Sequence, residues 1–283
     1  MTNAKAVTIA NESIQLEQGV QLAYYDSAPA LDGIGAISSQ VIVLLHGYCG
    51  SSAYWEQIVP LLEAHARVIA VDLRGHGASF EASEEVYTMD LFAQDIKQLI
   101  ERLNLPKVCL LGHSLGGYVT LAAAEAYPEL LGSIGLIHST SLPDGEEAKA
   151  NRDKAALAIQ TNGVQEFVNG LVPKLFSPEH VTAMAEAVQL TKEIGYGTSA
   201  RGASATALGM KGRPDRTSVL QQSPLPILLV AGARDGVIPP ERTFIVDKPA
   251  VKKVTLELSG HMSMLEESER LAAAIVDFAA GRA

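Results

Sequence analysis

One serine in the chain stands where it could act as a nucleophile. Ser114 is the centre of the segment Gly112-His-Ser-Leu-Gly116, which fits the pattern G-x-S-x-G. Alone the pattern is weak, because on the order of one chain in ten of this length carries it by chance. Its setting makes it specific, since an apolar run of strand type (108–111) precedes it and a helical pattern (115–127) follows it. A tight strand–turn–helix exposes the serine hydroxyl and requires small residues on both sides of it. The sequence therefore predicts Ser114 as the nucleophile of an acyl transfer.

A serine hydroxyl is a poor nucleophile at neutral pH and needs an adjacent base. Among seven histidines, His261 follows the last strand pattern and precedes the final helix pattern, at the sheet edge where catalytic groups gather. An imidazole in this role needs a carboxylate that fixes its tautomer and stabilises its cation. Asp235 directly follows the apolar run 227–230, whereas the rival Asp144 stands well beyond the preceding strand. The predicted triad is Ser114 with His261 as general base and Asp235 as orienting acid.

Acyl transfer also needs hydrogen-bond donors for the developing oxyanion. The backbone N–H of Leu115 opens a helix whose dipole favours negative charge, so it is one predicted donor. The backbone N–H of Tyr48 is the second, because Gly47 lets the loop after residue 45 approach closely. Cys49 and His138 follow strand ends and are candidate pocket-lining residues. This chemistry needs neither a cofactor nor a metal, and neither cysteine lies in a metal-ligand pattern.

The elements that must position these residues alternate along the chain. Short apolar runs, typical of strands buried on both faces, alternate with helical patterns, which indicates a mostly parallel, twisted sheet flanked by helices. The predicted strands are 41–45, 68–71, 108–111, 134–137 and 227–230, with a weaker one at 254–258 and an antiparallel hairpin at 13–25. The predicted helices are 54–64, 89–103, 115–127 and 266–280.

The alternation breaks between residues 141 and 222. This region has helical periodicity, no convincing strand, and glycines and prolines that divide it into about four helices. Asp144-x-x-Glu147 is predicted to cap the first of them. We expect a core domain of residues 1–140 and 223–283 with a helical cap, 141–222, inserted between two strands. The cap is rich in apolar residues, which favours a modest apolar pocket, and Val172 is a trial position for filling it.

Composition excludes several other functions. The formal net charge of −10 argues against binding of nucleic acid or of anionic membrane surfaces, although a local basic pocket could override it for one ligand. No apolar stretch approaches the roughly 20 residues that span a bilayer. The first ten residues do not resemble a signal peptide, so cytoplasmic residence is expected. Cys49 and Cys109 are then expected to be small buried hydrophobic residues.

Taken together, the motifs resemble the α/β-hydrolase superfamily along nearly the whole chain, and in particular its compact bacterial esterases, enol-lactonases and cofactor-free haloperoxidase-like hydrolases. The segments that carry the resemblance are 46–51, 72–79, 112–117, 232–235 and 260–261. It implies an α/β-hydrolase fold with a helical cap after the sixth strand. It also makes Asp72, Arg74 and His76 structural residues of a turn. Epoxide hydrolases and haloalkane dehalogenases of the superfamily carry aspartate as nucleophile, so Ser114 argues against both.

The function expected from the sequence is hydrolysis of a small carboxylic ester through an acyl-enzyme. Hydrolysis of a lactone or of a C–C bond would use the same triad, and the cap would decide between them. A receptor that keeps the triad but binds a signal with little turnover is an alternative of another class. The partner in each case is a small molecule, and the sequence leaves the oligomeric state open.

Overall fold

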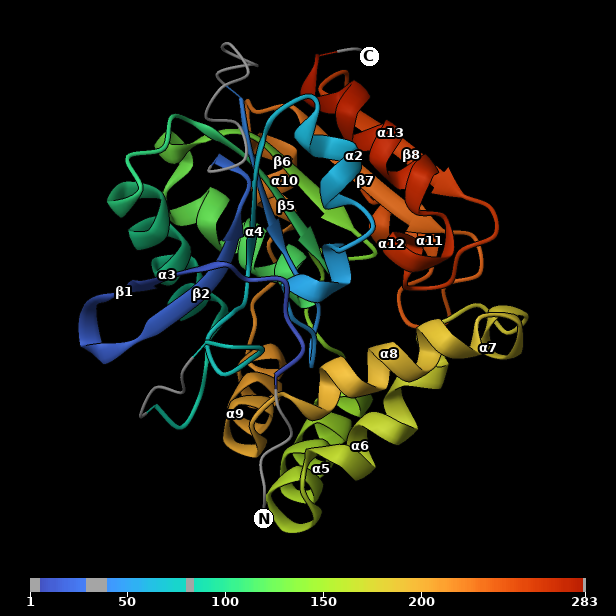
Figure 1. The fold of residues 1–283 in the computed structure, drawn as a ribbon. Coiled ribbons are helices and arrows are strands. Elements are labelled where there is room, and N and C mark those ends of the chain that lie inside the picture. The colour runs from blue at the N-terminus through green and yellow to red at the C-terminus, as the bar shows by residue number, and fades with distance from the viewer. Residues whose placement is uncertain (1–5, 29–39, 80–83, 282–283) are drawn as a thin grey trace.

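The computed structural model describes residues 6–28, 40–79 and 84–281. In this part of the chain one eight-stranded sheet has the order β1-β2-β4-β3-β5-β6-β7-β8 (Figure 1). The strands from β3 to β8 pair in parallel, and β1 and β2 form the predicted antiparallel hairpin, which joins the sheet through β4. The strands are β1 (Glu12–Gln15), β2 (Gln21–Asp26), β3 (Val41–Leu45), β4 (Arg67–Val71), β5 (Val108–His113), β6 (Leu131–Ile137), β7 (Ile227–Gly232) and β8 (Val251–Leu256).

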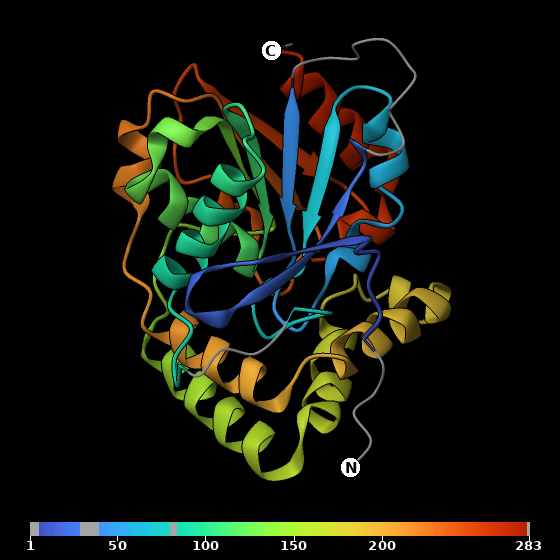
Figure 2. The ribbon, with the colours of Figure 1, turned by 60° about the vertical axis from the view of Figure 1, so that its left-hand side comes forward.

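Helices cover both faces of the sheet (Figure 2). Helices α3 (Met89–Arg102), α4 (Leu115–Ala126) and α10 (Thr217–Gln222) pack on one face, and α2 (Val59–Glu63) and α13 (Ser268–Ala279) pack on the other. The predicted helix 54–64 forms as two pieces, because Pro60 favours a new helix start in the middle of it. Short helices complete the core: η1 (Glu17–Gly19), η2 (Ser52–Trp55), η3 (Pro128–Leu130), α11 (Pro240–Thr243) and α12 (Ser263–Glu266).

The segment between β6 and β7 is helical, so the cap follows the sixth strand as predicted. It contains α5 (Glu146–Asn162), α6 (Val164–Leu171), η4 (Val172–Lys174), α7 (His180–Ala183), α8 (Ala185–Tyr196), α9 (Ala200–Lys211) and α10. Four of these helices are long, namely α5, α6, α8 and α9, and four is the number that the sequence predicts. The short helices α7 and α10 were not predicted. These four lie together beyond the carboxyl ends of the strands, at the bottom of Figures 1 and 2.

The predicted helix cap at Asp144 is wrong. Helix α5 begins at Glu146 with Gly145 as its N-cap, and no side chain caps it. The carboxylate of Asp144 instead lies 3.1 Å from Nε of Arg152 and 2.7 Å from Nη2 of Arg213. Two guanidinium groups therefore outcompete the backbone amides for this carboxylate, since hydrogen bonds between charged groups are the stronger ones.

The turn after β4 has the structural role that the sequence implies. Asp72 is buried and accepts hydrogen bonds from the backbone N–H groups of Ser52 (2.6 Å) and Ala78 (2.8 Å). Arg74 is also buried and pairs with Asp95 at 2.6 Å. The turn thus attaches the loop after β3, which carries Tyr48, to the neighbouring strand. None of the helices within the described ranges has the length and apolar character needed to cross a membrane.

Buried histidines beside this turn make the fold sensitive to acid. His46 is fully buried, and its Nδ1–H donates to the carbonyl of Gly47 (2.7 Å) while its Nε2 accepts from the N–H of Leu73 (2.9 Å). Burial lowers the pKa of His46 to about 4, and burial together with His46 lowers the pKa of His76 to about 3. In the unfolded chain each pKa returns to about 6.5, so below that pH the unfolded state binds protons that the folded state excludes.

We therefore expect the free energy of unfolding to fall as the pH drops from about 6.5 toward 4, by up to about 1.4 kcal/mol per pH unit for each such histidine. Urea unfolding at several pH values between about 7 and 5 measures this slope. His46→Asn should make this slope shallower, since His76, His113 and His138 also have lowered pKa values, whereas replacing the exposed His65 by glutamine should not change it. A stability that stayed constant across this range would contradict the expectation.

Candidate active site

Ser114 occupies the sharp turn between β5 and α4. A Cβ on Gly112 would lie 2.1 Å from the backbone of Gly116, and a Cβ on Gly116 would lie 2.5 Å from the carbonyl oxygen of Leu45. Both positions therefore require glycine. Ser114 itself has φ +51° and ψ −110°, a conformation that costs a non-glycine residue energy. Its N–H donates to the carbonyl of Ile137 (3.0 Å), which helps to hold the turn at the carboxyl edge of the sheet.

Asp235 is fixed in the loop after β7. Its Oδ1 accepts hydrogen bonds from the backbone N–H groups of Val237 (2.8 Å) and Ile238 (2.9 Å). Its Oδ2 accepts from Nδ1–H of His261 at 2.7 Å, and both side chains are buried. The structure thus brings together the two residues, from distant segments, that the sequence predicts as base and orienting acid.

His261 is held from both sides of its backbone. Its N–H donates to the cap carbonyl of Leu175 (2.7 Å), and its carbonyl accepts from Nε2–H of His113 (2.8 Å). The neighbouring amides of Gly260 and Met262 donate to the buried carboxylate of Glu266 at 2.9 and 3.1 Å. Because Nδ1–H is taken by Asp235, Nε2 of His261 is the nitrogen left to accept a proton.

His138 is placed against Asp235 rather than along the cavity. His138 directly follows β6 and has a φ of +49°, which is uncommon for a residue other than glycine. Nδ1 of His138 lies 3.1 Å from Oδ2 of Asp235, and its Nε2 lies 2.7 Å from the hydroxyl oxygen of Ser263. The backbone N–H of Gly232 also lies against this Nδ1, at 3.2 Å. The ionised carboxylate of Asp235 only accepts, and its charge-assisted contact favours the tautomer with the proton on Nδ1, in which Nε2 accepts from Ser263. Two imidazoles therefore share one carboxylate oxygen.

The charges of this cluster follow from burial and pairing. Burial on its own raises the pKa of Asp235, but the imidazoles of His261 and His138 outweigh it and hold that pKa well below its usual range. Burial lowers the pKa of His138 and of His113, which keeps both rings neutral at pH 7. His138, Asp235 and His261 also present potential metal ligands within 4.8 Å of one another. In this arrangement the two Nδ1 atoms are already engaged as hydrogen-bond donors to Asp235.

A cavity of about 60 Å³ lies beside Ser114. Core and cap both line it, since Ser114 and His261 face it together with Arg152 from α5, Leu171 from α6 and Met210 from α9. The rest of the lining is Tyr48, Tyr54, His113, Tyr118, Leu175 and Val237. This places Tyr48 at the cavity, whereas Cys49 and His138 are not among these residues. Burial raises the pKa of the Cys49 thiol to about 12, so the thiol stays neutral.

The two predicted amide donors can be located as well. Leu115 is the first residue of α4, directly after Ser114, and Tyr48 lies in the loop after β3. Among the described residues, neither backbone N–H donates a hydrogen bond to another group of the protein.

Comparison with known proteins places the chain in a family. The sequence profile of the alpha/beta hydrolase fold matches residues 40–268, which is well over half of the chain and includes Ser114, Asp235 and His261. The chain belongs to this family. The match confirms the resemblance drawn from the motifs, and together with the sheet and its flanking helices it confirms the predicted fold class.

Individual members of the alpha/beta-hydrolase family show how far the likeness extends. The chain is 32% identical over 247 residues to a dihydrolipoyllysine-residue acetyltransferase component of the acetoin cleaving system of Pseudomonas putida, over 84% of this chain but only 63% of that protein. It is 30% identical to a 2-(acetamidomethylene)succinate hydrolase of Mesorhizobium japonicum, over 71% of this chain and 73% of the relative. A thermophilic esterase of Thermogutta terrifontis superimposes with a TM-score of 0.87 at 28% identity, over 96% and 98% of the two chains.

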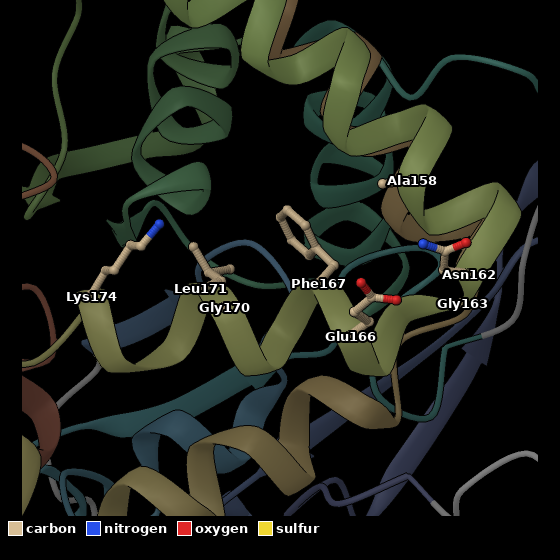
Figure 3. Close-up of a pocket in the computed structure, with 8 residues that line it drawn as sticks. All are labelled: Ala158, Asn162, Gly163, Glu166, Phe167, Gly170, Leu171 and Lys174. Atoms are coloured by element: carbon tan, nitrogen blue, oxygen red, sulfur yellow. The ribbon is translucent and has the colours of Figure 1, made fainter.

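This alpha/beta hydrolase has a second cavity, which opens at the surface of its cap (Figure 3). It measures about 300 Å³ and lies between α5 and α6, lined by Ala158, Asn162, Gly163, Glu166, Phe167, Gly170, Leu171 and Lys174. Leu171 lines this cavity and also the one beside Ser114, so its side chain stands between them. The ring of Phe167 packs edge-on against Tyr48, with 5.7 Å between the ring centroids. Val172, the trial position named from the sequence, is the next residue after Leu171; it is buried and lines neither cavity.

Leu171 should therefore set the size of the acyl group that fits. Leu171→Ala is expected to join the two cavities and to raise kcat/KM for hexanoyl over acetyl esters by about tenfold, since each methylene in an apolar pocket is worth 1–3 kcal/mol. Leu171→Trp should shift the preference the other way. The exposed Leu157 of α5, changed to alanine, is a matched control that should leave the profile unchanged.

Acyl-length profiles of the three variants, with thermal unfolding to confirm the folded state, measure this effect. Profiles that are the same in all of them would show that Leu171 does not limit the pocket.

Sequence reasoning missed that Arg152 and Leu171 line the cavity beside Ser114 and that His138 pairs with Asp235. Arg152 is one of several basic residues in helix α5, and their spacing alone does not say which one turns toward the core. The pairing of His138 depends on a backbone conformation that no motif announces.

Proposed function

We propose that this alpha/beta hydrolase cleaves a small carboxylic ester through an acyl-enzyme. The observation that carries the proposal is the 2.7 Å contact between Nδ1 of His261 and Oδ2 of Asp235, with His261 lining the same cavity as Ser114. The strained turn at Ser114 supports it, because a serine held in such a conformation at a helix N-terminus is typical of a nucleophile. The similarity to an esterase and to a hydrolase agrees with this reaction class.

In the proposed mechanism, His261 Nε2 takes the proton of Ser114 Oγ as this oxygen attacks the carbonyl carbon. Asp235 holds the tautomer with the proton on Nδ1 and stabilises the imidazolium that forms. The N–H groups of Tyr48 and Leu115 donate to the oxyanion, the latter with the dipole of α4 behind it. Collapse of the tetrahedral intermediate expels the alcohol, which receives the proton from His261.

Water then attacks the acyl-enzyme, with His261 again as base, and releases the acid and the serine. No step requires a cofactor or a metal. Residues 141–222 act in this proposal as a cap domain that shapes the pocket, over a core of residues 1–140 and 223–283.

The test is turnover of a panel of short acyl esters, lactones and β-diketones by the purified protein. Many cycles on esters, abolished by loss of Ser114, would support the proposal. Preference for lactones or β-diketones by the same serine would move the assignment to a lactonase or a C–C hydrolase. A single stoichiometric burst without further turnover would favour a receptor.

A further inference from the structure

Arg152 brings a permanent positive charge to the cavity beside Ser114. It is on α5, and 27% of its side chain remains exposed. Apart from two histidines, the other residues that line this cavity within the described part of the chain are aromatic, aliphatic or hydroxyl-bearing. The protein as a whole carries a net charge of −10, so a cation at this place is a local exception. Its position next to the nucleophile points to a role toward the substrate.

The charge of Arg152 is only partly balanced inside the protein. Nε of Arg152 donates to Oδ2 of Asp144 (3.1 Å), while Oδ1 of the same carboxylate accepts from Nη2 of Arg213 (2.7 Å). Burial raises the pKa of Asp144, but the two arginines hold it below its usual range, so the carboxylate is ionised. One negative charge thus faces two positive ones, and the group keeps a net charge of +1.

Of the two arginines, Arg152 is the one that lies at the cavity. Arg213 is 4% exposed, and its guanidinium carbon lies 4.0 Å from the centroid of the Tyr118 ring, outside the cavity lining. Arg152 lines the cavity, and among the described residues no acceptor is recorded for its two Nη groups. Four N–H donors of a planar fork are therefore not taken up by a described acceptor of the protein, and this fork matches the two oxygens of a carboxylate.

We propose that Arg152 binds a carboxylate of the substrate, so that the ester cleaved at Ser114 belongs to the class that carries a negative charge. This inference rests on the proposed function, because it assigns a substrate class to the same site. A carboxylate held by Arg152 would replace the water around its Nη groups and would orient the ester within the cavity. It would also explain why the cap places an arginine, rather than another apolar residue, beside an otherwise largely uncharged pocket.

Matched esters test the substrate class. Mono-4-nitrophenyl adipate and 4-nitrophenyl hexanoate have acyl chains of the same length, and the first carries a terminal carboxylate. Likewise 4-carboxyphenyl acetate and phenyl acetate place or omit a carboxylate on the alcohol side. We expect one charged ester to be preferred over its neutral match. Arg152→Gln should lower kcat/KM for it by about 10- to 100-fold, the loss typical of a hydrogen bond between charged groups, and should change the neutral ester less than about threefold.

Two further variants control for charge and for helix integrity. Arg152→Lys keeps the charge without the fork and should recover part of the preference. Lys154→Gln removes an exposed charge from the same helix and should leave the ratio unchanged. Thermal unfolding confirms that each variant is folded, with Arg213 still available to pair with Asp144.

Binding without turnover separates this inference from the proposed function. Calorimetry with monoethyl adipate compares Ser114→Ala with the double variant that also has Arg152→Gln, and we expect affinity to weaken about tenfold or more. Turnover of neutral esters with no effect of Arg152 on preference or binding would overturn the carboxylate site alone. Absence of any Ser114-dependent turnover would overturn the proposed function, and the calorimetry would still decide the role of Arg152.

Discussion

Replacing Ser114 by alanine is expected to lower kcat for a short acyl ester by about 10⁵-fold or more, which is the scale seen when the nucleophile of a serine hydrolase is removed. No other group in the proposed mechanism forms the bond to the acyl carbon. The amides of Tyr48 and Leu115 would remain, so a small residual rate above that of water is expected. Initial rates at saturating 4-nitrophenyl acetate measure the loss.

The fold should survive this change. Alanine keeps the Cβ of Ser114 and faces the same backbone conformation, with φ +51°. Ser177 offers a matched control, because its buried hydroxyl has no hydrogen-bond partner within the described residues and it does not line the cavity. Ser177→Ala should therefore be fully active. Near-normal turnover by Ser114→Ala would mean that another group is the nucleophile.

Replacing Asp235 by asparagine is expected to lower kcat by about 10⁴-fold, through the tautomer of His261. Oδ1 of Asp235 accepts two backbone N–H groups, from Val237 and Ile238, and the oxygen of asparagine would keep this position. The amide NH₂ would then face Nδ1 of His261, where the carboxylate oxygen now accepts at 2.7 Å. A donor there forces the proton of His261 onto Nε2, so this nitrogen can no longer take the proton of Ser114.

The second imidazole makes this change more severe than in a site with one histidine. Nδ1 of His138 also faces Oδ2 of Asp235, so asparagine leaves two rings to be rearranged around one NH₂ group. Activity and thermal unfolding of Asp235→Asn should be measured together, with Asp144→Asn as the comparison for the rival acid. A large loss in Asp144→Asn together with near-normal rates in Asp235→Asn would move the orienting acid to Asp144.

Much of the core could be predicted because its strands are buried on both faces. The run 41–45 is a strand over just those residues, β3, and every one of them is buried. The turn at Ser114 was predictable for a related reason, since glycine at positions 112 and 116 is required by direct backbone contact. The contact of Gly112 with Gly116 lies within a few residues of sequence, so the motif carries it, whereas the contact of Gly116 with Leu45 comes from the neighbouring strand β3.

The edge of the sheet was less predictable. Strand β8 begins at Val251, three residues before the predicted strand 254–258, and most of its residues are half-buried or exposed. A strand with one exposed edge has no continuous apolar run, so its register is set by pairing with β7 and not by composition.

The cap was predictable as an insertion but not in its details. Val172 and Leu171 are adjacent and equally apolar, and only the phase of α6 against the core decides that Leu171 reaches the cavity. In the same way, the sequence offers Asp144 as a helix cap, while the fold pairs it with Arg152 on the next helix and with the distant Arg213. Contacts that depend on how one helix sits on another are fixed by packing across the whole cap.

Covalent labelling tests directly whether Ser114 is an activated nucleophile, and it needs no knowledge of the natural substrate. A fluorophosphonate should add once per chain to the folded protein, and peptide mass spectrometry should find the adduct on Ser114. Ser114→Ala should take up no label, and Asp235→Asn should react far more slowly. A folded protein that takes up no label, or a label on another serine that persists in Ser114→Ala, would contradict the account.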